Sequence, residues 1–488
     1  MYFNVVNYAA LKRSDYIKLL EEKDHKIQHL LFELEQLKRA LFGSKSERFI
    51  GIHSPEQLRL FTALQEELTA LQEEQISYKR KKVKKKPKRT KLPDSLERVV
   101  TVLEPAGDVS QMEKIGEQVT EKLSLIPAKA YVEQTVRPKY KDQEGAFHIA
   151  ELPSDPFPKS IASANLAAHI AVQKYVDHQP LYRQSKIWQR QRVDLPRSTL
   201  CGIIRKGALL LSPLYEAMIS KVMQGPYLMA DESSIPVQGT TPKHEKIKKG
   251  CMLVKVAPLE ALAVMEYIRT KEKENIIKSL EGFKGYLQVD GNVSYKELGT
   301  MDGVTLMHCL VHARRYFEKA KDYDLVKTNE MLGMIQQLYQ IERQIKDEPP
   351  NSKLIIRQKH SEPITEKMKK WLEENLELYP PDSPMTTAIR YMLNRWAGLT
   401  VFLNNGDLRP DNNLIENQIR PLAIGRKNYL FAGSENGAQY AAIFYSFFAT
   451  CKMNKINPYD WLVDVYKKIS DYPVNKIHEL IPDKNYQF

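Results

Sequence analysis

The stretch that decides the fold of this chain is YLMADESS, from Tyr227 to Ser234. An apolar run ends there in a carboxylate and is followed by small polar residues. Two further apolar runs come next, CMLVKVA at 251–257 and AVMEYI at 263–268. Short apolar runs separated by polar turns are typical of buried strands. We therefore expect three successive strands from residue 227 onward.

Downstream of these strands, helical and strand patterns alternate. The order is a helix KEKENIIKSL at 271–280, strands GYLQVD at 285–290 and GVTLMHCL at 303–310, and a helix VHARRYFEKAKDY at 311–323. Three antiparallel strands followed by parallel ones joined by helices are typical of the mixed sheet of an RNase H-like domain. In that order the first and fourth strands lie side by side, so Asp231 and Asp290 would meet at adjacent strand ends.

The second part of this α/β domain is expected after a helical insertion. Residues 324–405 are helical and charged in pattern, with interruptions at proline pairs, so we interpret them as an all-α insertion into a catalytic core made of 224–323 and 406–450. In the return stretch DNNLIENQIRP, one of the first three residues would cap a helix that displays Glu416. Residues 451–488 are expected to form a helical tail.

Asp231, Asp290 and Glu416 are the candidate catalytic and metal-binding residues. Mg²⁺ and Mn²⁺ are hard cations that prefer carboxylate oxygens. Two such ions can activate an attacking oxygen and stabilise a leaving one in phosphodiester chemistry. Without metal, three close carboxylates would raise one another's pKa.

Each acid also has a purely structural interpretation. Asp290 and the glycine after it form a common tight-turn pair. Glu416 has capping-box spacing from Asn413, so it can satisfy a backbone N–H. Asp231 can simply end a strand. The three interpretations weaken together, because the acids fall at the three places where this fold needs them.

Basic and metal-ligating side chains follow Asp290 and Glu416 in the sequence. A zinc site from His308, Cys309 and His312 is conceivable, but a fourth ligand is not evident. We expect instead that His312 and Arg315 lie near the scissile phosphate or pack against the sheet. Phosphate contacts, or alternatively a solvated basic loop, are expected at Arg420, Arg426, Lys427 and Asn428.

The N-terminal segment, 1–75, has the apolar spacing of a coiled coil. A heptad series runs through Leu20, Ile27, Leu34 and Leu41, and charged residues fill the other faces. This pattern predicts self-association into a homo-oligomer. The alternative is an amphipathic helix packed on its own chain.

A basic linker follows at 76–94. Self-repulsion should keep it extended, either as an arm on a nucleic-acid backbone or as a solvated connection. Its candidate DNA contacts are Lys79, Arg80, Lys81, Lys82, Lys84, Lys85, Lys86, Lys88, Arg89 and Lys91.

Two smaller regions precede the α/β domain. Residues 95–160 alternate in pattern, as in RVVTVLEP and AYVEQTVRPKY, and predict a small β-rich module. Residues 161–223 are helical, with a short turn before Pro196 that resembles a helix-turn-helix. Its last helix would present Arg197, Arg205 and Lys206 to DNA, and a plain helical hairpin is the alternative.

Charge and cysteine usage narrow the function class. The 488 residues carry a formal net charge of +13, which favours polyanions such as nucleic acid. The longest apolar stretch, 438–451, is too short to cross a bilayer, so we expect a buried helix and no membrane partner. We see no secretion signal, and the four cysteines lie far apart. We therefore expect a reduced, cytoplasmic protein.

Long motifs of this chain resemble the insertion-sequence-sixty-six family of transposases. They include LFGSKSERF, IPAKAYVEQTVRPKY, KYVDHQPLYRQSKIWQR, LPRSTL, ADESSIPV, YLQVDGNVSY, HCLVHARRYF and the 52-residue block from Asp411 to Leu462, DNNLIENQIRPLAIGRKNYLFAGSENGAQYAAIFYSFFATCKMNKINPYDWL. The resemblance implies a DDE transposase whose triad falls on Asp231, Asp290 and Glu416. It also implies double-stranded DNA as partner, at the element ends and at the target, and possible accessory transposition proteins.

The sequence departs from the family pattern at three places. The family usually carries cysteine pairs in the small module, where this chain has YKDQEG, so zinc is not expected here. Asn417 stands where arginine is common, and Ser233 where threonine is. Two rival functions remain: an RNase H-like nuclease that only hydrolyses, and a catalytically inactive DNA-binding protein.

Overall fold

The computed structural model describes residues 130–141, 147–151, 154–239, 247–291 and 293–488, together with Lys23, Lys26 and Leu30. The coiled coil expected in 1–75 and the basic linker at 76–94 with its ten candidate DNA contacts therefore lie outside the described residues, as does the strand pattern RVVTVLEP. The chain divides into two compact units: 44–151 forms one, and 1–43 with 152–488 forms the other.

The described part of the smaller unit is a two-stranded hairpin. Strand β1 (Lys139–Lys141) pairs antiparallel with β2 (Phe147–Ile149), and Arg137 Nη1 donates to the carbonyl of Ala150 at 2.8 Å. The strand expected from AYVEQTVRPKY is wrong in most of its length, because regular pairing begins only at Lys139. Pro138 has no N–H to give to a ladder, and the side chains before it bury no apolar face.

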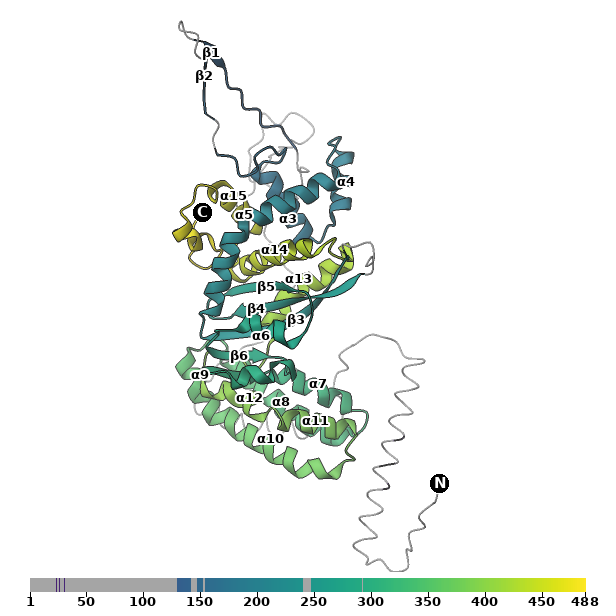
Figure 1. Cartoon of the computed structure of the whole chain (residues 1–488). Helices are drawn as coiled ribbons and strands as arrows, with labels where there is room; N and C mark the ends of the chain where they lie inside the picture. The colour runs from purple at the N-terminus through teal and green to yellow at the C-terminus, as the bar shows by residue number, and fades with distance from the viewer. Residues whose placement is uncertain are drawn as a thin grey trace, which may run out of the picture. The chain divides into compact units, whose positions relative to one another are not determined.

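The larger unit is built on a five-stranded sheet with the order β5-β4-β3-β6-β7. Its strands are β3 (Tyr227–Val237), β4 (Lys248–Ala257), β5 (Leu262–Ile268), β6 (Gly285–Val289) and β7 (Val304–His308). Strands β3, β4 and β5 pair antiparallel, whereas β6 and β7 run parallel to β3 (Figure 1). The predicted adjacency of the first and fourth strands of this sheet is confirmed.

Strand β3 is longer than expected, and this corrects the placement of Asp231 at a strand end. Pairing of β3 with β6 stops at Met229 opposite Gln288, but pairing with β4 continues to Val237 opposite Lys248. Asp231 therefore lies within the strand, at the point where β3 loses its neighbour on one side and continues only with β4.

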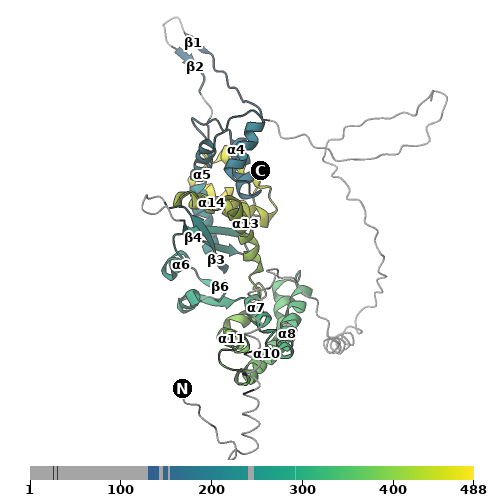
Figure 2. The same ribbon diagram turned by 90° about the vertical axis from the view of Figure 1, so that its right-hand side faces the viewer.

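Helices pack around this sheet. Helices α3 (Ala164–Tyr175), α4 (Leu181–Arg190) and α5 (Arg197–Met223) occupy the region where three helices were predicted. Helix α6 (Lys273–Leu280) and the later helix α13 (Asn413–Tyr429) lie on opposite sides of the strands (Figure 2). Helix α5 carries a continuous buried stripe, from Leu200 to Val222, that joins the main core.

Helix α14 (Glu435–Asn454) covers the β5 edge of the sheet. The apolar stretch predicted to be a buried helix is confirmed, because its residues from Ala441 to Cys451 are all buried. The hydroxyl oxygen of Ser446 accepts the N–H of Met265 at 2.7 Å, and that of Thr450 accepts the N–H of Ala263 at 3.0 Å. Among the described residues, no helix is long and apolar enough to span a membrane.

The end of α14 shifts one expected boundary. The helix runs without a break through residue 450, where the catalytic core was expected to end, and stops at Asn454 because Lys455 adopts a left-handed conformation with φ of 58°. Helix α15 (Pro458–Lys468) and a short 3-10 helix at Val474–Leu480 complete the tail.

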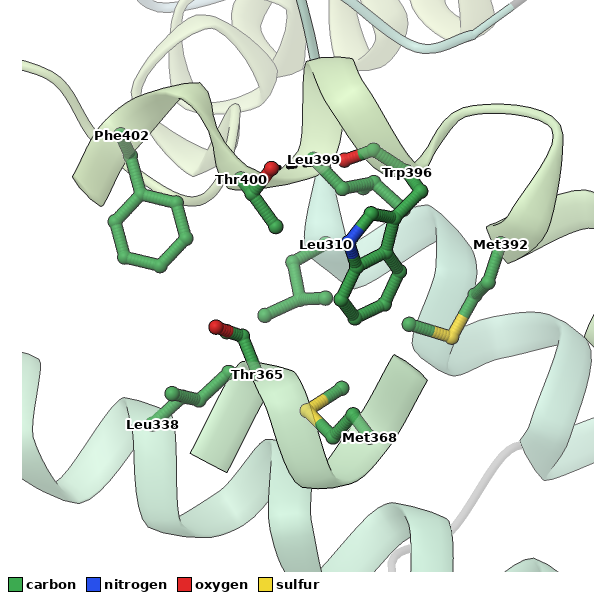
Figure 3. A pocket seen from close by; sticks show the side chains of 9 residues that line it. All are labelled: Leu310, Leu338, Thr365, Met368, Met392, Trp396, Leu399, Thr400 and Phe402. Carbon is green, nitrogen blue, oxygen red and sulfur yellow. Dashed lines mark hydrogen bonds between the residues drawn. The ribbon is translucent and has the colours of Figure 1, made fainter. Parts of the chain in front are cut away.

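The stretch predicted to be an all-α insertion consists of helices joined by turns. It contains α8 (Leu325–Gln344), α9 (Pro350–Ile356), α10 (Glu362–Asn375), α11 (Pro384–Leu393) and α12 (Trp396–Thr400), and α7 (Leu310–Ala320) precedes it. Helices α7, α8, α10, α11 and α12 share an apolar core of their own. A small apolar pocket lies inside it, where Leu338, Met368 and Trp396 face one another (Figure 3).

A buried arginine ties the insertion to the chain that leaves it. The Arg357 side chain is 2% exposed and forms two hydrogen bonds of 2.7 Å with the Glu342 carboxylate. It also donates to the carbonyls of Phe402, Asn405 and Leu408, each at 2.9 Å. The return segment 402–408 is therefore anchored before it reaches α13.

Candidate active site

The sheet brings the two candidate aspartates to the same region. Strand β3 pairs with β6 through Tyr227 with Tyr286 and Met229 with Gln288, and this pairing ends two residues before Asp231 and two residues before Asp290. Neighbouring strands lie about 4.8 Å apart, so the parallel pair leads both aspartates to the same edge of the sheet.

Side-chain alternation decides which face of the sheet carries these aspartates. Residues two apart on a strand share a face, so Asp231 lies on the same face as Ser233. The Ser233 hydroxyl accepts a hydrogen bond of 3.0 Å from Arg426, which belongs to α13. Glu232 points the other way and pairs with Lys271 at 3.2 Å. Asp231 therefore shares its face of β3 with a serine that contacts α13.

A polar network brings α13 to this edge. The Tyr227 hydroxyl donates to Gln288 Oε1 at 2.5 Å, and Gln288 Nε2 donates to the carbonyl of Arg409 at 2.9 Å. At the end of β7, the Cys309 thiol donates to Asn412 Oδ1 at 2.9 Å. Because Asn412 is the N-cap of α13, Glu416 lies in the first turn of a helix that begins beside β6 and β7.

The Glu416 carboxylate forms an ion pair with the guanidinium of Arg315 on α7. Arg315 Nη2 lies 3.2 Å from Glu416 Oε1 and 3.4 Å from Oε2, and Arg315 Nη1 lies 3.3 Å from His312 Nε2. Both partners of the ion pair remain open to solvent, with side chains 52% and 30% exposed. Such a pair adds little to stability. Another ligand of the Glu416 carboxylate can therefore replace the Arg315 guanidinium at a small cost in free energy.

The electrostatics of the site are those of crowded carboxylates. Burial raises the pKa of the Asp231 carboxyl to about 7, and the charges of Asp290, Glu232 and Glu416 add to the rise, although the Glu232 N–H that donates to Asp231 opposes it. Burial also lowers the pKa of His312, with a further contribution from Arg315. Asp231 therefore holds its proton more tightly than an ordinary aspartate.

The donor set fits a hard divalent cation, but the carboxylates do not surround a common point. Within the described ranges, no group of three His, Cys, Asp or Glu side chains is arranged so that it could hold a metal ion. The conceivable zinc ligand Cys309 uses its thiol on Asn412 instead. Asp231 and Asp290 both follow the paired part of β3 and β6, whereas the Glu416 carboxylate is bonded to Arg315.

Among the described residues, the candidate DNA contacts Arg197, Arg205, Arg315, Arg420 and Lys427 are exposed, and His312 is partly exposed. Several candidates bond within the protein. Arg315 bonds Glu416 and His312, Lys206 donates to the carbonyl of Pro158, Arg426 donates to Ser233 and Ser234, and Asn428 accepts from Arg183.

Sequence reasoning missed Tyr391 and Arg395, which contact the turn after β6 from the insertion. They lie about a hundred residues from that turn in sequence. No local motif marks them.

Matches to protein-family models cover most of the chain. Residues 159–440 match the model described as transposase IS66 family, and 446–482 match the IS66 C-terminal element. Residues 29–101 match the model described as transposase C of IS166 homeodomain, and 105–141 match the zinc-finger binding domain of transposase IS66. The last of these segments contains neither cysteine nor histidine in this chain.

Full-length relatives occur in Sinorhizobium fredii. The uncharacterized protein y4hP is 31% identical over 93% of this chain and 88% of its own length. The uncharacterized protein y4qI is 31% identical over 97% of this chain and 92% of its own length. The similarity therefore extends over the sheet, the insertion and the tail together.

Proposed function

Because the chain belongs to the IS66 family of transposases, we propose that it cuts the ends of an insertion element and joins them to target DNA. The catalytic domain would be RNase H-like, and the triad would be Asp231, Asp290 and Glu416. A water would attack the phosphodiester at the element end, and the freed 3′-hydroxyl would then attack the target strand in line. Neither step needs a covalent bond between protein and DNA.

One observation carries this proposal. The parallel pairing of β3 with β6 ends two residues before Asp231 and two residues before Asp290, and the charges of Asp290 and Glu416 both act on Asp231, which supports a meeting of the three carboxylates. An isolated turn aspartate or a capping glutamate would not need such a meeting of three segments. The raised pKa of Asp231 supports the same conclusion, because it reflects burial beside other carboxylates.

The three carboxylates would hold Mg²⁺ or Mn²⁺, which supplies an activated oxygen nucleophile and stabilises the leaving oxygen when bound. Glu416 would exchange Arg315 for the cation, and Arg315 would then be available to a DNA phosphate. His312, kept neutral by its lowered pKa, would add no competing positive charge beside the cation. Zinc is not part of the proposal, since the segment that matches the zinc-finger model lacks thiol and imidazole ligands.

DNA would lie across the exposed basic residues around this edge. Arg420 and Lys427 on α13 and Arg197 and Arg205 on α5 would contact phosphates, with the basic linker as a further arm. The N-terminal heptads would pair copies of the chain so that two element ends meet, and accessory proteins can take part. This activity would take place on the nucleoid in the cytoplasm.

The test uses two isosteric variants and a pair of DNA substrates. Asp290→Asn and Glu416→Gln should abolish cleavage of element ends, because each replaces a carboxylate ligand by a weaker amide, while DNA binding measured by gel shift is retained. End cleavage at the wild-type rate in either variant would refute the site. A second duplex without element ends distinguishes strand joining from hydrolysis alone, since only a transposase links the two duplexes.

A further inference from the structure

The helical insertion holds the turn that follows β6. The Tyr391 hydroxyl, at the end of α11, donates to the carbonyl of Asp290 at 2.8 Å. Arg395 donates to the next carbonyl, that of Gly291, through Nε at 2.9 Å and Nη2 at 2.7 Å. The Arg395 guanidinium lies 4.1 Å from the centre of the Tyr391 ring, which stacks on Tyr316 of α7 at 4.2 Å. Two successive carbonyls are thus held by a preformed stack of side chains.

The turn is shaped for this contact. Gly291 has φ of +85°, and a Cβ atom there would lie 2.7 Å from the Tyr391 hydroxyl and 2.8 Å from Arg395 Nε. Only glycine combines that backbone conformation with so close an approach. The fit between turn and insertion therefore depends on both sides.

The same helices also contact the neighbouring strand. A Cβ atom at Gly398 of α12 would lie 2.6 Å from the His308 ring at the end of β7. The insertion therefore packs against β7 as well as against the turn after β6.

We propose that Tyr391 and Arg395 are positioning residues that hold the Asp290 carboxylate in place, so that the helical insertion sets how tightly the catalytic site takes a divalent cation. On one side, Asp290 follows Val289, which is paired with His308 in the sheet. On the other side, its own carbonyl and the next one are held by the insertion. The backbone on both sides of the Asp290 side chain is thus fixed, which is the preorganisation that a ligand carboxylate needs. The inference rests on the proposed function in taking Asp290 as a metal ligand.

The test compares three variants of the full chain. Tyr391→Phe removes one hydroxyl donor and keeps the stacked ring, and Arg395→Lys keeps the charge but loses the planar fork. Leu338→Ala is the matched control, because it opens the apolar pocket of the same insertion without touching the turn (Figure 3). Mg²⁺ binding is measured by calorimetry, and the Mg²⁺ dependence of end cleavage is measured alongside it.

A positioning role predicts weaker Mg²⁺ binding in Tyr391→Phe and Arg395→Lys, by up to about tenfold for one lost hydrogen bond. Excess Mg²⁺ should restore most of the cleavage rate. Leu338→Ala should lower the melting temperature and leave the Mg²⁺ affinity unchanged. Wild-type Mg²⁺ affinity in both turn variants would overturn the inference, as would an equal loss of affinity in Leu338→Ala.

Asp290→Asn separates this inference from the proposed function. If Asp290→Asn binds Mg²⁺ and cleaves like the wild type, Asp290 is not a ligand and both ideas fail. If Asp290→Asn loses Mg²⁺ binding while Tyr391→Phe and Arg395→Lys bind normally, the proposed function stands and the positioning role is wrong.

Discussion

Replacing Arg357 by alanine should lower the free energy of unfolding more than the loss of any exposed ion pair in the insertion does. The substitution leaves the Glu342 carboxylate, 15% exposed, without its bidentate partner, and it strips a donor from the carbonyls of Phe402, Asn405 and Leu408. An uncompensated buried charge alone costs about 3–5 kcal/mol. Each orphaned carbonyl can cost about 1–3 kcal/mol, but these losses do not add in full because water enters the site. We expect a loss of about 4 kcal/mol.

Urea unfolding followed by tryptophan fluorescence can measure this loss, since Trp371 and Trp396 both lie in the insertion. Amide exchange should quicken in segment 402–408, which Arg357 holds. End cleavage should fall as well, because this segment leads to Arg409 and the start of α13. Lys370→Ala is the matched control: it removes an exposed pair with Glu374 and should change stability by less than about 0.5 kcal/mol. Equal effects of Arg357→Ala and Lys370→Ala would refute the reasoning.

The remaining predictions concern the site and the sheet edge. In metal-free protein, Asp231 keeps its proton in the folded state up to a pKa of about 7 and loses it near its ordinary value of 3.8 when unfolded, so it lowers stability as pH rises between these values. Asp231→Asn should therefore be more stable than the wild type, and the difference in the free energy of unfolding should grow from about pH 5 to pH 7 and level off above. This difference should stay below about 4 kcal/mol, because solvent screens a partly buried carboxyl. A margin that does not change with pH in thermal melts would contradict this. Ser446→Ala should cost about 1–3 kcal/mol in urea unfolding, since it leaves the buried N–H of Met265 without an acceptor; Ser220→Ala, at an exposed site on α5, is its control and should be nearly silent.

The strands and their order could be predicted because apolar runs and intervening helices leave few topologies for a mixed sheet. The pairing of β3, which contains Asp231, with β6, which precedes Asp290, follows from that order. The continuation of β3 through Ser233 and Ser234 could not be predicted, because those polar residues are held in strand form by pairing with β4 rather than by their own pattern.

Contacts between distant segments of the chain could not be predicted from the sequence either. The Arg315–Glu416 pair and the Tyr391 and Arg395 contacts join residues about a hundred positions apart. Nothing in the local pattern around Tyr391 distinguishes it from other half-polar aromatic residues of a packed helix. Such contacts depend on how the insertion folds back onto the sheet.

The hydroxyls of Ser446 and Thr450 cover part of the β5 edge of the sheet. The β5 amides of Ala263 and Met265 are already bonded to α14, and α12 packs on β7 at the opposite edge. Open borders invite edge-to-edge growth and aggregation. Any association between copies of the chain would therefore be expected to use helices or terminal segments rather than the β5 edge of the sheet.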